Sequence, residues 1–208
     1  MDELLTQLNP EQRVAVTTID GPLLIIAGAG SGKTRVITVR IAYMLSQGIE
    51  PKQILALTFT NKAANEMKHR VKELAGPAAK DLTVSTFHAF GLAVLRRYFR
   101  AVGLRENFTI YDTADQVALL KETAREEGLP PEEIQLSDLI AIFSKIKTGR
   151  TPLSTLSEEY QRLYRSYQSH LRLYNAVDFD DLIVEPARLL QENEKARAHY
   201  QDRFSYIM

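Results

Sequence analysis

The stretch AGAGSGKTRV, residues 27–36, constrains the fold of this chain more than any other feature. Three glycines fall within five positions, and a lysine and a threonine follow them. A wholly apolar run, PLLIIA at residues 22–27, precedes the loop, and a helix is expected at 33–46 with Gly48 placed to end it. A buried strand followed by a glycine loop and a helix is typical of a phosphate-binding loop.

Each residue type in this loop has a mechanical role. Glycines let backbone N–H groups approach a phosphate closely, and the following helix directs its positive end at the same anion. We expect Lys33 to reach the β- and γ-phosphates and the Thr34 hydroxyl to bind Mg²⁺, and we predict these two as the catalytic residues. The predicted phosphate-binding set is Ala27, Gly28, Ala29, Gly30, Ser31, Gly32, Lys33 and Thr34.

The loop departs from the generic pattern G-x-x-x-x-G-K-[ST] in its first position, which is Ala27. The alternative interpretation is a glycine-rich turn that binds nothing. Asn61-Lys62 is not followed by the aspartate at position 64 that guanine recognition would want, because that residue is Ala64. No aspartate in the chain has a glycine three residues later, so a GTPase switch motif is also missing. We therefore expect ATP, with Mg²⁺, as the nucleotide.

The overall composition does not indicate a binding partner. Lys+Arg and Asp+Glu are balanced at 26 each, so a nucleic-acid surface would have to come from local clustering. The absence of cysteine excludes a disulfide framework and a thiolate zinc site. The N-terminus lacks the apolar region of a signal peptide, and no apolar run approaches the ~18 residues of a membrane span. A cytoplasmic location is expected.

Strand and helix signals alternate in the first third of the chain. Further strands are expected at 54–59 and 82–87, separated by a helix at 62–75, and FSYIM at 204–208 looks like a fourth strand just starting. This alternation predicts an α/β fold with a parallel sheet. Because such sheets usually carry more strands, the sheet is expected to be incomplete and the chain to be a piece of a longer protein.

After about residue 108 the sequence pattern becomes helical and polar. We predict three segments: a first part of the α/β domain at 1–106, an all-helical insertion at 107–177, and a return to the α/β domain at 178–208, with helices near 178–191 and 194–203. A stripe at helical spacing is expected to be core packing within the insertion: Tyr160, Leu163, Tyr164, Tyr167, Leu171 and Tyr174.

Five blocks occur in one order: LNPEQRVAV, AGAGSGKTRV, ILALTFTNKAANEM, VSTFHAFG and VDFDDLI. Together they resemble the superfamily I DNA helicases of the UvrD, PcrA and Rep type, and the resemblance covers essentially the whole chain. It implies a RecA-like P-loop ATPase domain, 1A, with an inserted helical domain, 1B. It also implies an ATP-dependent 3′→5′ helicase of DNA repair or replication, acting on single-stranded DNA and single-strand/duplex junctions.

The resemblance assigns two more nucleotide contacts. Gln12 would read the adenine edge, which a glutamine amide can do by donating and accepting. Arg35 would pack near the base. The residues themselves leave alternatives open: Gln12 stands where it could close a capping box with Asn9 as N-cap, and Arg35 could be a solvated helix charge.

DNA contacts are predicted just past two strand ends, where open α/β sheets place ligands. The resemblance favours DNA for Phe59, Thr60, Asn61, Lys62, Thr86, Phe87 and His88. The alternatives are Phe59 in the core, Asn61 as a helix cap and His88 as a structural hydrogen-bonding residue. Three further sets of charged residues are candidates. Arg96, Arg97 and Arg100 could follow a DNA backbone or form a solvated helix face, and Lys145, Lys147 and Arg150 could contact duplex DNA. Asp178, Asp180 and Asp181 could suggest a metal site, but helix caps and first-turn acids are the preferred interpretation.

Two parts that the resemblance calls for are not in the sequence. A strand ending in Asp-Glu would hold Mg²⁺ and activate water, and a second RecA-like domain would close the ATP cleft. We therefore expect this chain alone to bind nucleotide weakly and not to unwind DNA. The alternatives are a non-catalytic DNA-binding fragment, the helicase part of a recombination nuclease-helicase, and a small-molecule kinase with a phosphate loop.

Overall fold

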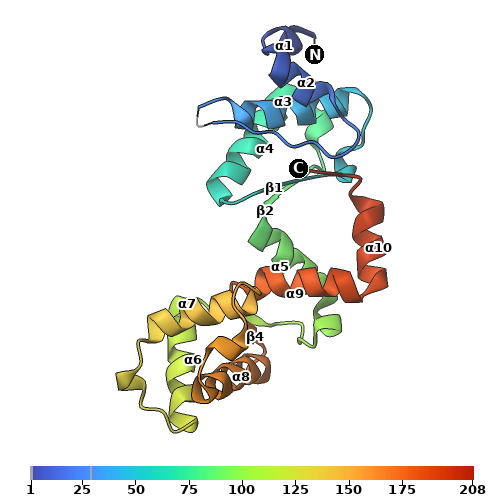
Figure 1. Ribbon diagram of the computed structural model, residues 1–208. Helices are drawn as coiled ribbons and strands as arrows, with labels where there is room; N and C mark the ends of the chain where they lie inside the picture. The colour runs from blue at the N-terminus through green and yellow to red at the C-terminus, as the bar shows by residue number, and fades with distance from the viewer. Residues whose placement is uncertain (1, 29) are drawn as a thin grey trace. The chain divides into compact units, whose positions relative to one another are not determined.

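The computed structural model describes residues 2–28 and 30–208 (Figure 1). Its contacts divide the chain into two compact units: the residues up to Phe87 together with Ala198–Met208, and His88–Arg197. The first unit holds a short parallel sheet flanked by helices, and the second is mainly helical. The predicted α/β class, with an incomplete parallel sheet and a helical insertion, is confirmed. The domain boundaries at 106/107 and 177/178 stay a prediction.

The sheet of the first unit has three strands. β1 (Ile54–Thr58) lies between β2 (Thr83–Thr86) and β5 (Tyr206–Ile207), and both pairings are parallel. β1 is buried along its first residues because a strand at the centre of such a sheet is covered on both faces. The expected strands at 54–59, 82–87 and the chain's last residues are therefore present.

Two helices cover this sheet side by side. They are α3 (Lys33–Ser46) and α4 (Asn61–Ala75), and their apolar residues meet those of the strands in one core cluster: Ile41, Ala56, Ala64, Met67, Val71 and Val84. α2 (Pro10–Thr17) packs on the other flank of α3 through Val16, Val36 and Val39, and α1 (Asp2–Thr6) precedes it. α3 begins and ends where the sequence predicts, with Gly48 at a φ of +85° just after it. These contacts fix the start of α3, and hence the glycine loop, against the sheet.

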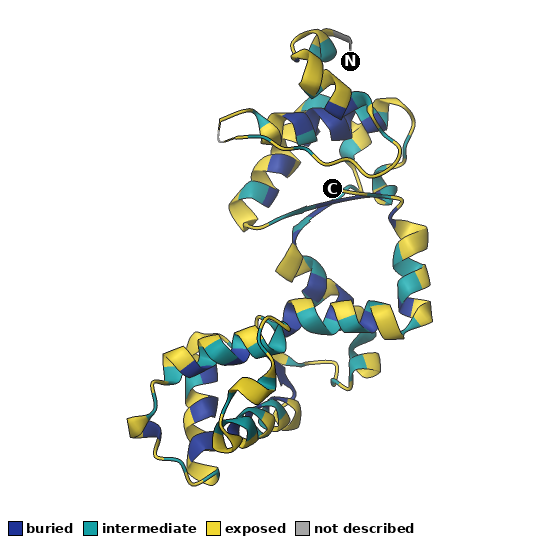
Figure 2. Ribbon diagram, viewed as in Figure 1, coloured by how far each residue is buried: buried dark blue, intermediate teal, exposed yellow. Residues whose placement is uncertain are grey.

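The prediction of a buried strand at residues 22–27 is wrong. Within the described part of the chain this run belongs to no strand, and Leu24 and Ile26 are 84% and 90% exposed (Figure 2). A strand is buried only when neighbouring strands and covering helices supply partners for its backbone and side chains. The three strands of this sheet pair with one another, so the apolar run has the composition of a central strand without its partners.

The second unit is built around three helices of the insertion (Figure 1). α6 (Thr113–Glu126) packs against both α7 (Leu136–Lys147) and α8 (Glu158–Leu173), and the pair β3 (Thr109–Ile110) and β4 (Ala176–Val177) closes the insertion where it begins and ends. The predicted stripe is core packing: Leu163, Tyr167 and Leu171 are buried and Tyr160 and Tyr164 pack beside them. Tyr174 differs, because it is partly exposed and donates to Glu122 at 2.7 Å.

Three helices complete this part of the chain. α5 (Phe87–Tyr98) and α9 (Asp181–Glu192) share a small apolar cluster of Leu95, Val177 and Leu182, and α10 (Glu194–Arg203) follows α9. α5 from His88 onward and all of α9 belong to the second unit. None of the helices in the described residues is long and apolar enough to cross a membrane.

Gly91 marks a close approach of α5 to the backbone of α9. A Cβ at this position would lie 1.7 Å from the Leu182 carbonyl oxygen and 3.3 Å from Pro186 Cγ. We predict that Gly91→Ala lowers the free energy of unfolding by about 3 kcal/mol, because backbone cannot move aside as a side chain can. Denaturant unfolding followed by circular dichroism measures the change, with Ala93→Ser on the exposed face of α5 as the control. Equal midpoints for Gly91→Ala and the parent would contradict the packing described.

Candidate nucleotide and nucleic-acid site

The glycine loop turns sharply into α3. Gly30 and Gly32 have φ values of +74° and +84°, which glycine adopts at little cost and other residues avoid. Ala27 and Gly28 have no positive φ, which explains why alanine is tolerated in the first position of the pattern. Ala29 also belongs to the predicted set and lies outside the described residues. Two of the predicted loop glycines thus have a conformational reason to be glycine.

The N-terminus of α3 presents donors without a side-chain cap. Gly32 is the N-cap residue and offers no side-chain hydrogen bond, and the first intrahelical bond runs from Val36 N–H to the Gly32 carbonyl. The N–H groups of Lys33, Thr34 and Arg35 therefore precede the helical hydrogen-bond ladder. In contrast, the N-termini of α2 and α4 are capped by Asn9 and Thr60. An anion at the start of α3 would meet free donors and the positive end of the helix dipole.

Lys33 brings a full charge to the same place. Its ammonium donates to the carbonyls of Ala27 at 2.9 Å and Gly28 at 2.5 Å, so it lies against the loop rather than extending into solvent. The Ser31 hydroxyl also donates to the Gly28 carbonyl, at 2.6 Å. Turn, helix end and ammonium thus converge around the loop, which is the combination that binds a phosphate chain.

Gln12 and Arg35 both have partners in the structure. The Gln12 side chain accepts from Asn9 N–H at 3.2 Å while Asn9 accepts from Gln12 N–H at 2.8 Å, so the capping box considered from sequence is present. The Gln12 amide also donates to the Ser31 carbonyl at 3.2 Å, which places it beside the loop. Arg35 donates to Gln7 at 2.9 Å, a partner that sequence reasoning missed. Contact of Gln12 and Arg35 with an adenine base stays a prediction.

Thr34 is the residue in this loop that could hold Mg²⁺. Its hydroxyl is a hard oxygen ligand on an exposed residue next to Lys33, and Mg²⁺ commonly takes only one or two protein ligands beside phosphates and water. The described residues contain no cluster of three acidic or histidine side chains placed to hold a metal. The donor set therefore fits an ion that arrives with a nucleotide.

The parallel register of β1 and β2 brings two phenylalanines together. Thr58 lies opposite Thr86, so Phe59 and Phe87 follow at the same edge of the sheet, with ring centroids 5.5 Å apart. Phe59 is 88% exposed and Phe87 is 41% exposed, which excludes the alternative that Phe59 is a core residue. Two exposed aromatic rings at the carboxyl end of a parallel sheet form a surface on which a base can stack.

The residues after Phe59 start α4. Thr60 is its N-cap and accepts from Ala63 N–H at 3.1 Å, so the cap is Thr60 and not Asn61 as the alternative had it. Asn61 and Lys62 stand exposed in the first turn. A phosphate could approach the open side chains of this turn while Thr60 fixes its geometry.

His88 belongs to the second unit and has an aromatic neighbour that sequence reasoning missed. The Phe179 ring lies edge-on to it, with centroids 6.1 Å apart, and Phe179 is 49% exposed. The available signal was a phenylalanine flanked by acids in VDFDD, an apolar side chain in a polar stretch. An exposed aromatic there is a candidate stacking group.

The acids around Phe179 are a structural cluster. Asp178 and Asp181 each accept from the other's backbone N–H at 3.0 Å, and Lys147 of α7 donates to Asp178 at 2.6 Å and lies 3.0 Å from Asp181. Asp178 and Asp181 thus make the reciprocal bonds of a capping box, whereas Asp180, the N-cap residue of α9, makes no side-chain cap bond and accepts from the Ser144 hydroxyl at 3.1 Å. The structure also corrects the assignment of Lys147 as a duplex contact, because its side chain is only 7% exposed.

Burial and the attraction between opposite charges act in opposite directions on the pKa values of Asp181 and Lys147. Burial raises the pKa of Asp181 to about 6, although Lys147 opposes the rise. Burial lowers the pKa of Lys147, but the attraction of Asp181 and Asp178 outweighs it and the net pKa is raised. The ammonium therefore stays charged and compensates carboxylates that water does not reach.

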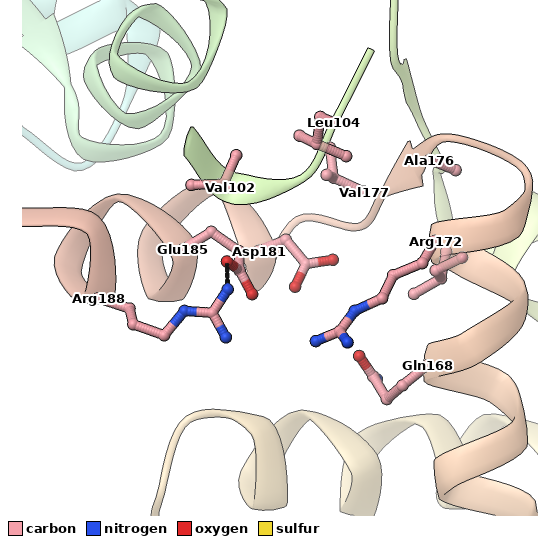
Figure 3. Close-up of a pocket in the computed structure, with 10 residues that line it drawn as sticks. Val102, Leu104, Gln168, Arg172, Ala176, Val177, Asp181, Glu185 and Arg188 are labelled. Carbon is pink, nitrogen blue, oxygen red and sulfur yellow. Dashed lines mark hydrogen bonds and ion pairs between the residues drawn. The ribbon is translucent and has the colours of Figure 1, made fainter. Parts of the chain in front are cut away.

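A cavity beside this cluster is too small for a nucleotide. Its volume is about 40 Å³, room for little more than a water molecule. Figure 3 shows the side chains of Arg172, Asp181 and Arg188 directed toward it, with Arg188 paired to Glu185. Sites for nucleotide-sized ligands measure hundreds of cubic ångströms, so this cavity is not a candidate nucleotide site.

Comparison with known proteins follows this geometry. The family model described as the UvrD/REP helicase N-terminal domain matches residues 8–208. The chain belongs to the UvrD/REP helicase family. The match runs from Leu8, just before the capping box of α2, through the glycine loop and both aromatic strand ends to the last residue.

Curated relatives of this UvrD/REP chain are much longer than it is. The ATP-dependent DNA helicase PcrA of Bacillus subtilis (strain 168) is 41% identical over 215 residues, which cover 99% of this chain and 29% of that protein. The ATP-dependent DNA helicase Rep of Escherichia coli (strain K12) is 43% identical over 213 residues, or 97% of this chain and 31% of that protein. PcrA of Staphylococcus aureus (strain Mu50) is 41% identical, with 100% and 30% covered.

Proposed function

We propose that this chain is the nucleotide-binding and DNA-binding part of an ATP-dependent DNA helicase. The observation that carries the proposal is the convergence of Gly30, Gly32 and Lys33 on the N-terminus of α3. The relatives PcrA and Rep are ATP-dependent DNA helicases by name. The loop would hold the phosphates of ATP, with Mg²⁺ at Thr34 and with Gln12 and Arg35 near the base.

Each group in the loop would have a separate task. The backbone N–H groups of the α3 first turn would bind phosphate oxygens, and the Lys33 ammonium would move from the Ala27 and Gly28 carbonyls onto the β- and γ-phosphates. Mg²⁺ would neutralise developing charge on the transferred phosphate. Hydrolysis also needs a carboxylate that orients water, which the family resemblance places in a strand ending in Asp-Glu.

DNA would bind where β1 and β2 end. Phe59 and Phe87 would stack on bases, and Asn61 and Lys62 would contact the backbone. Thr60, the N-cap of α4, and Thr86, which is buried, would position these residues rather than reach the DNA. In the second unit His88 and Phe179 would add aromatic contacts. In the longer protein, ATP hydrolysis would drive 3′→5′ movement along single-stranded DNA and separation of the strands at a junction.

Phe59→Ala should weaken binding of single-stranded oligothymidylate to this chain by about tenfold, because stacking contributes ~1–3 kcal/mol per base. The ring is 88% exposed, so its loss should not disturb the fold. Fluorescence anisotropy at low salt measures the affinity, with Val14→Ala, another exposed apolar residue, as the control. Unchanged affinity for Phe59→Ala would remove this residue from the DNA site.

The chain alone should not couple ATP to DNA. It spans about 30% of the length of the relatives it matches, and the family resemblance implies that hydrolysis also uses an acidic element and a second ATPase domain. We expect weak nucleotide binding and no ATP turnover above background, with or without single-stranded DNA. DNA-stimulated turnover by the 208-residue chain would contradict the need for the missing carboxylates.

A further inference from the structure

The first unit has a groove that neither the nucleotide nor the DNA proposal uses. It has a volume of about 510 Å³ and is formed by the end of α4, the 3₁₀ turn η2 (Gly76–Ala79) and the chain leading into β2. Its lining residues are Lys68, Lys72, Gly76, Pro77, Ala79, Lys80 and Leu82. All of them lie in one compact unit.

The groove lies away from the proposed DNA edge. α4 begins at Asn61, beside the carboxyl end of β1, and its final residue is Ala75, so its axis carries the chain about 20 Å. Leu82 directly precedes β2, whereas Phe87 follows it. The groove is therefore at the amino-terminal edge of the sheet, opposite the aromatic pair.

The floor of the groove is apolar and firmly supported. Ala79 and Leu82 pack against the buried cluster that contains Met67 and Val71 of α4. Both are only partly buried, so one side faces the core and the other faces the groove. A partner that offered an apolar side chain would cover this surface and remove it from water.

The rim of the groove is positively charged because three lysines line it. Lys68, Lys72 and Lys80 are exposed, and none of them forms an ion pair within the described residues. Of the acids of α4, Glu66 pairs with Arg70, and Glu73 lies 3.3 Å from His69. Asp81 adjoins Lys80 in the chain but does not line the groove. Three lysines around an apolar floor complement an anionic partner that also carries apolar groups.

We propose that this groove docks an acidic peptide segment of a partner protein. An apolar side chain of the peptide lies on Ala79 and Leu82, and flanking carboxylates pair with Lys68, Lys72 and Lys80. A nucleic-acid backbone is the competing anion, but its phosphates and sugars present no apolar side chain to the floor. Charge sets the approach and orientation of the peptide, and the apolar contact supplies specificity.

The test uses a short fluorescein-labelled peptide rich in glutamate, with leucine and phenylalanine at its centre. Fluorescence anisotropy with the 208-residue chain should show saturable binding. The double variant Lys68→Glu/Lys72→Glu should weaken it by about tenfold, whereas Lys121→Glu on the exposed face of α6 should not. A second peptide, with serine in place of leucine and phenylalanine, should bind about tenfold more weakly than the first.

Each of the following results would overturn the proposal. The first is no saturable binding of the acidic peptide. The second is equal binding of the two peptides, which would show attraction of any polyanion. The third is an affinity that Lys68→Glu/Lys72→Glu leaves unchanged, or complete competition by oligothymidylate that survives Phe59→Ala, which would make the groove a nucleic-acid surface. Circular dichroism of the double variant establishes that its fold is intact, as expected for two exposed side chains.

Discussion

Lys147→Ala should lower the free energy of unfolding of the helical unit by about 3–5 kcal/mol, the usual cost of removing one partner from a buried ion pair. Lys147 is the cation that faces Asp178 and Asp181, and all three side chains are at most 10% exposed. Without it, two carboxylates remain out of water, and burial already raises the pKa of Asp181. Denaturant unfolding followed by far-ultraviolet circular dichroism measures the loss.

The matched control for this prediction is Lys145→Ala. Lys145 lies on the same helix, α7, and is exposed, so its removal should change the free energy of unfolding by less than about 0.5 kcal/mol. A double variant distinguishes the effect of charge from that of packing. Lys147→Met with Asp181→Asn should be more stable than Lys147→Ala, because it removes one uncompensated charge. A Lys147→Ala variant as stable as Lys145→Ala would show that the cluster is not held by this ion pair.

Lys33→Ala should reduce ATP turnover by at least about 100-fold in a longer form of the protein that contains the acidic element and the second ATPase domain. The Lys33 ammonium is the side-chain charge that the structure places against the glycine loop, at 2.9 Å from the Ala27 carbonyl. Its loss removes charge stabilisation at the β- and γ-phosphates. Steady-state phosphate release with saturating single-stranded DNA measures the effect, and strand separation should fall in parallel.

Lys52→Ala is the control for Lys33→Ala. Lys52 is an exposed lysine of the same unit that pairs with Glu50 at 2.7 Å, so it tests the loss of one surface charge without touching the loop. Its turnover should equal that of the parent. If Lys33→Ala still turned over ATP at the parent rate, the loop would not be the site of hydrolysis.

The sequence predicted the helices of this chain better than its first strand. α3 was predicted at its observed bounds because glycines flank it and its apolar residues follow the helical period. The run at 22–27 has an equally clear apolar pattern, but burial of a strand depends on partners that local sequence does not reveal. An apolar pattern therefore indicates which residues a segment could bury. Whether they are buried depends on the other segments that pack against it in the fold.

Some parts of the candidate site could likewise be predicted from the sequence, and others could not. The glycine loop was predictable because Gly30, Gly32 and Lys33 act through local geometry. The Phe59–Phe87 pair needed the register of two strands, which only the fold supplies. The burial of Lys147 and the approach of Phe179 to His88 join segments far apart in the chain, so no local pattern could separate them from surface residues.

Phosphorus NMR of Mg-ATP titrated with this chain tests the central claim most directly, because it observes the phosphates and tolerates weak binding. The account predicts that the β- and γ-phosphate resonances broaden and shift with added protein, and that Lys33→Ala abolishes the change while Lys52→Ala preserves it. Resonances that stayed unperturbed, or that responded equally to the Lys33→Ala protein, would contradict a phosphate site at the start of α3.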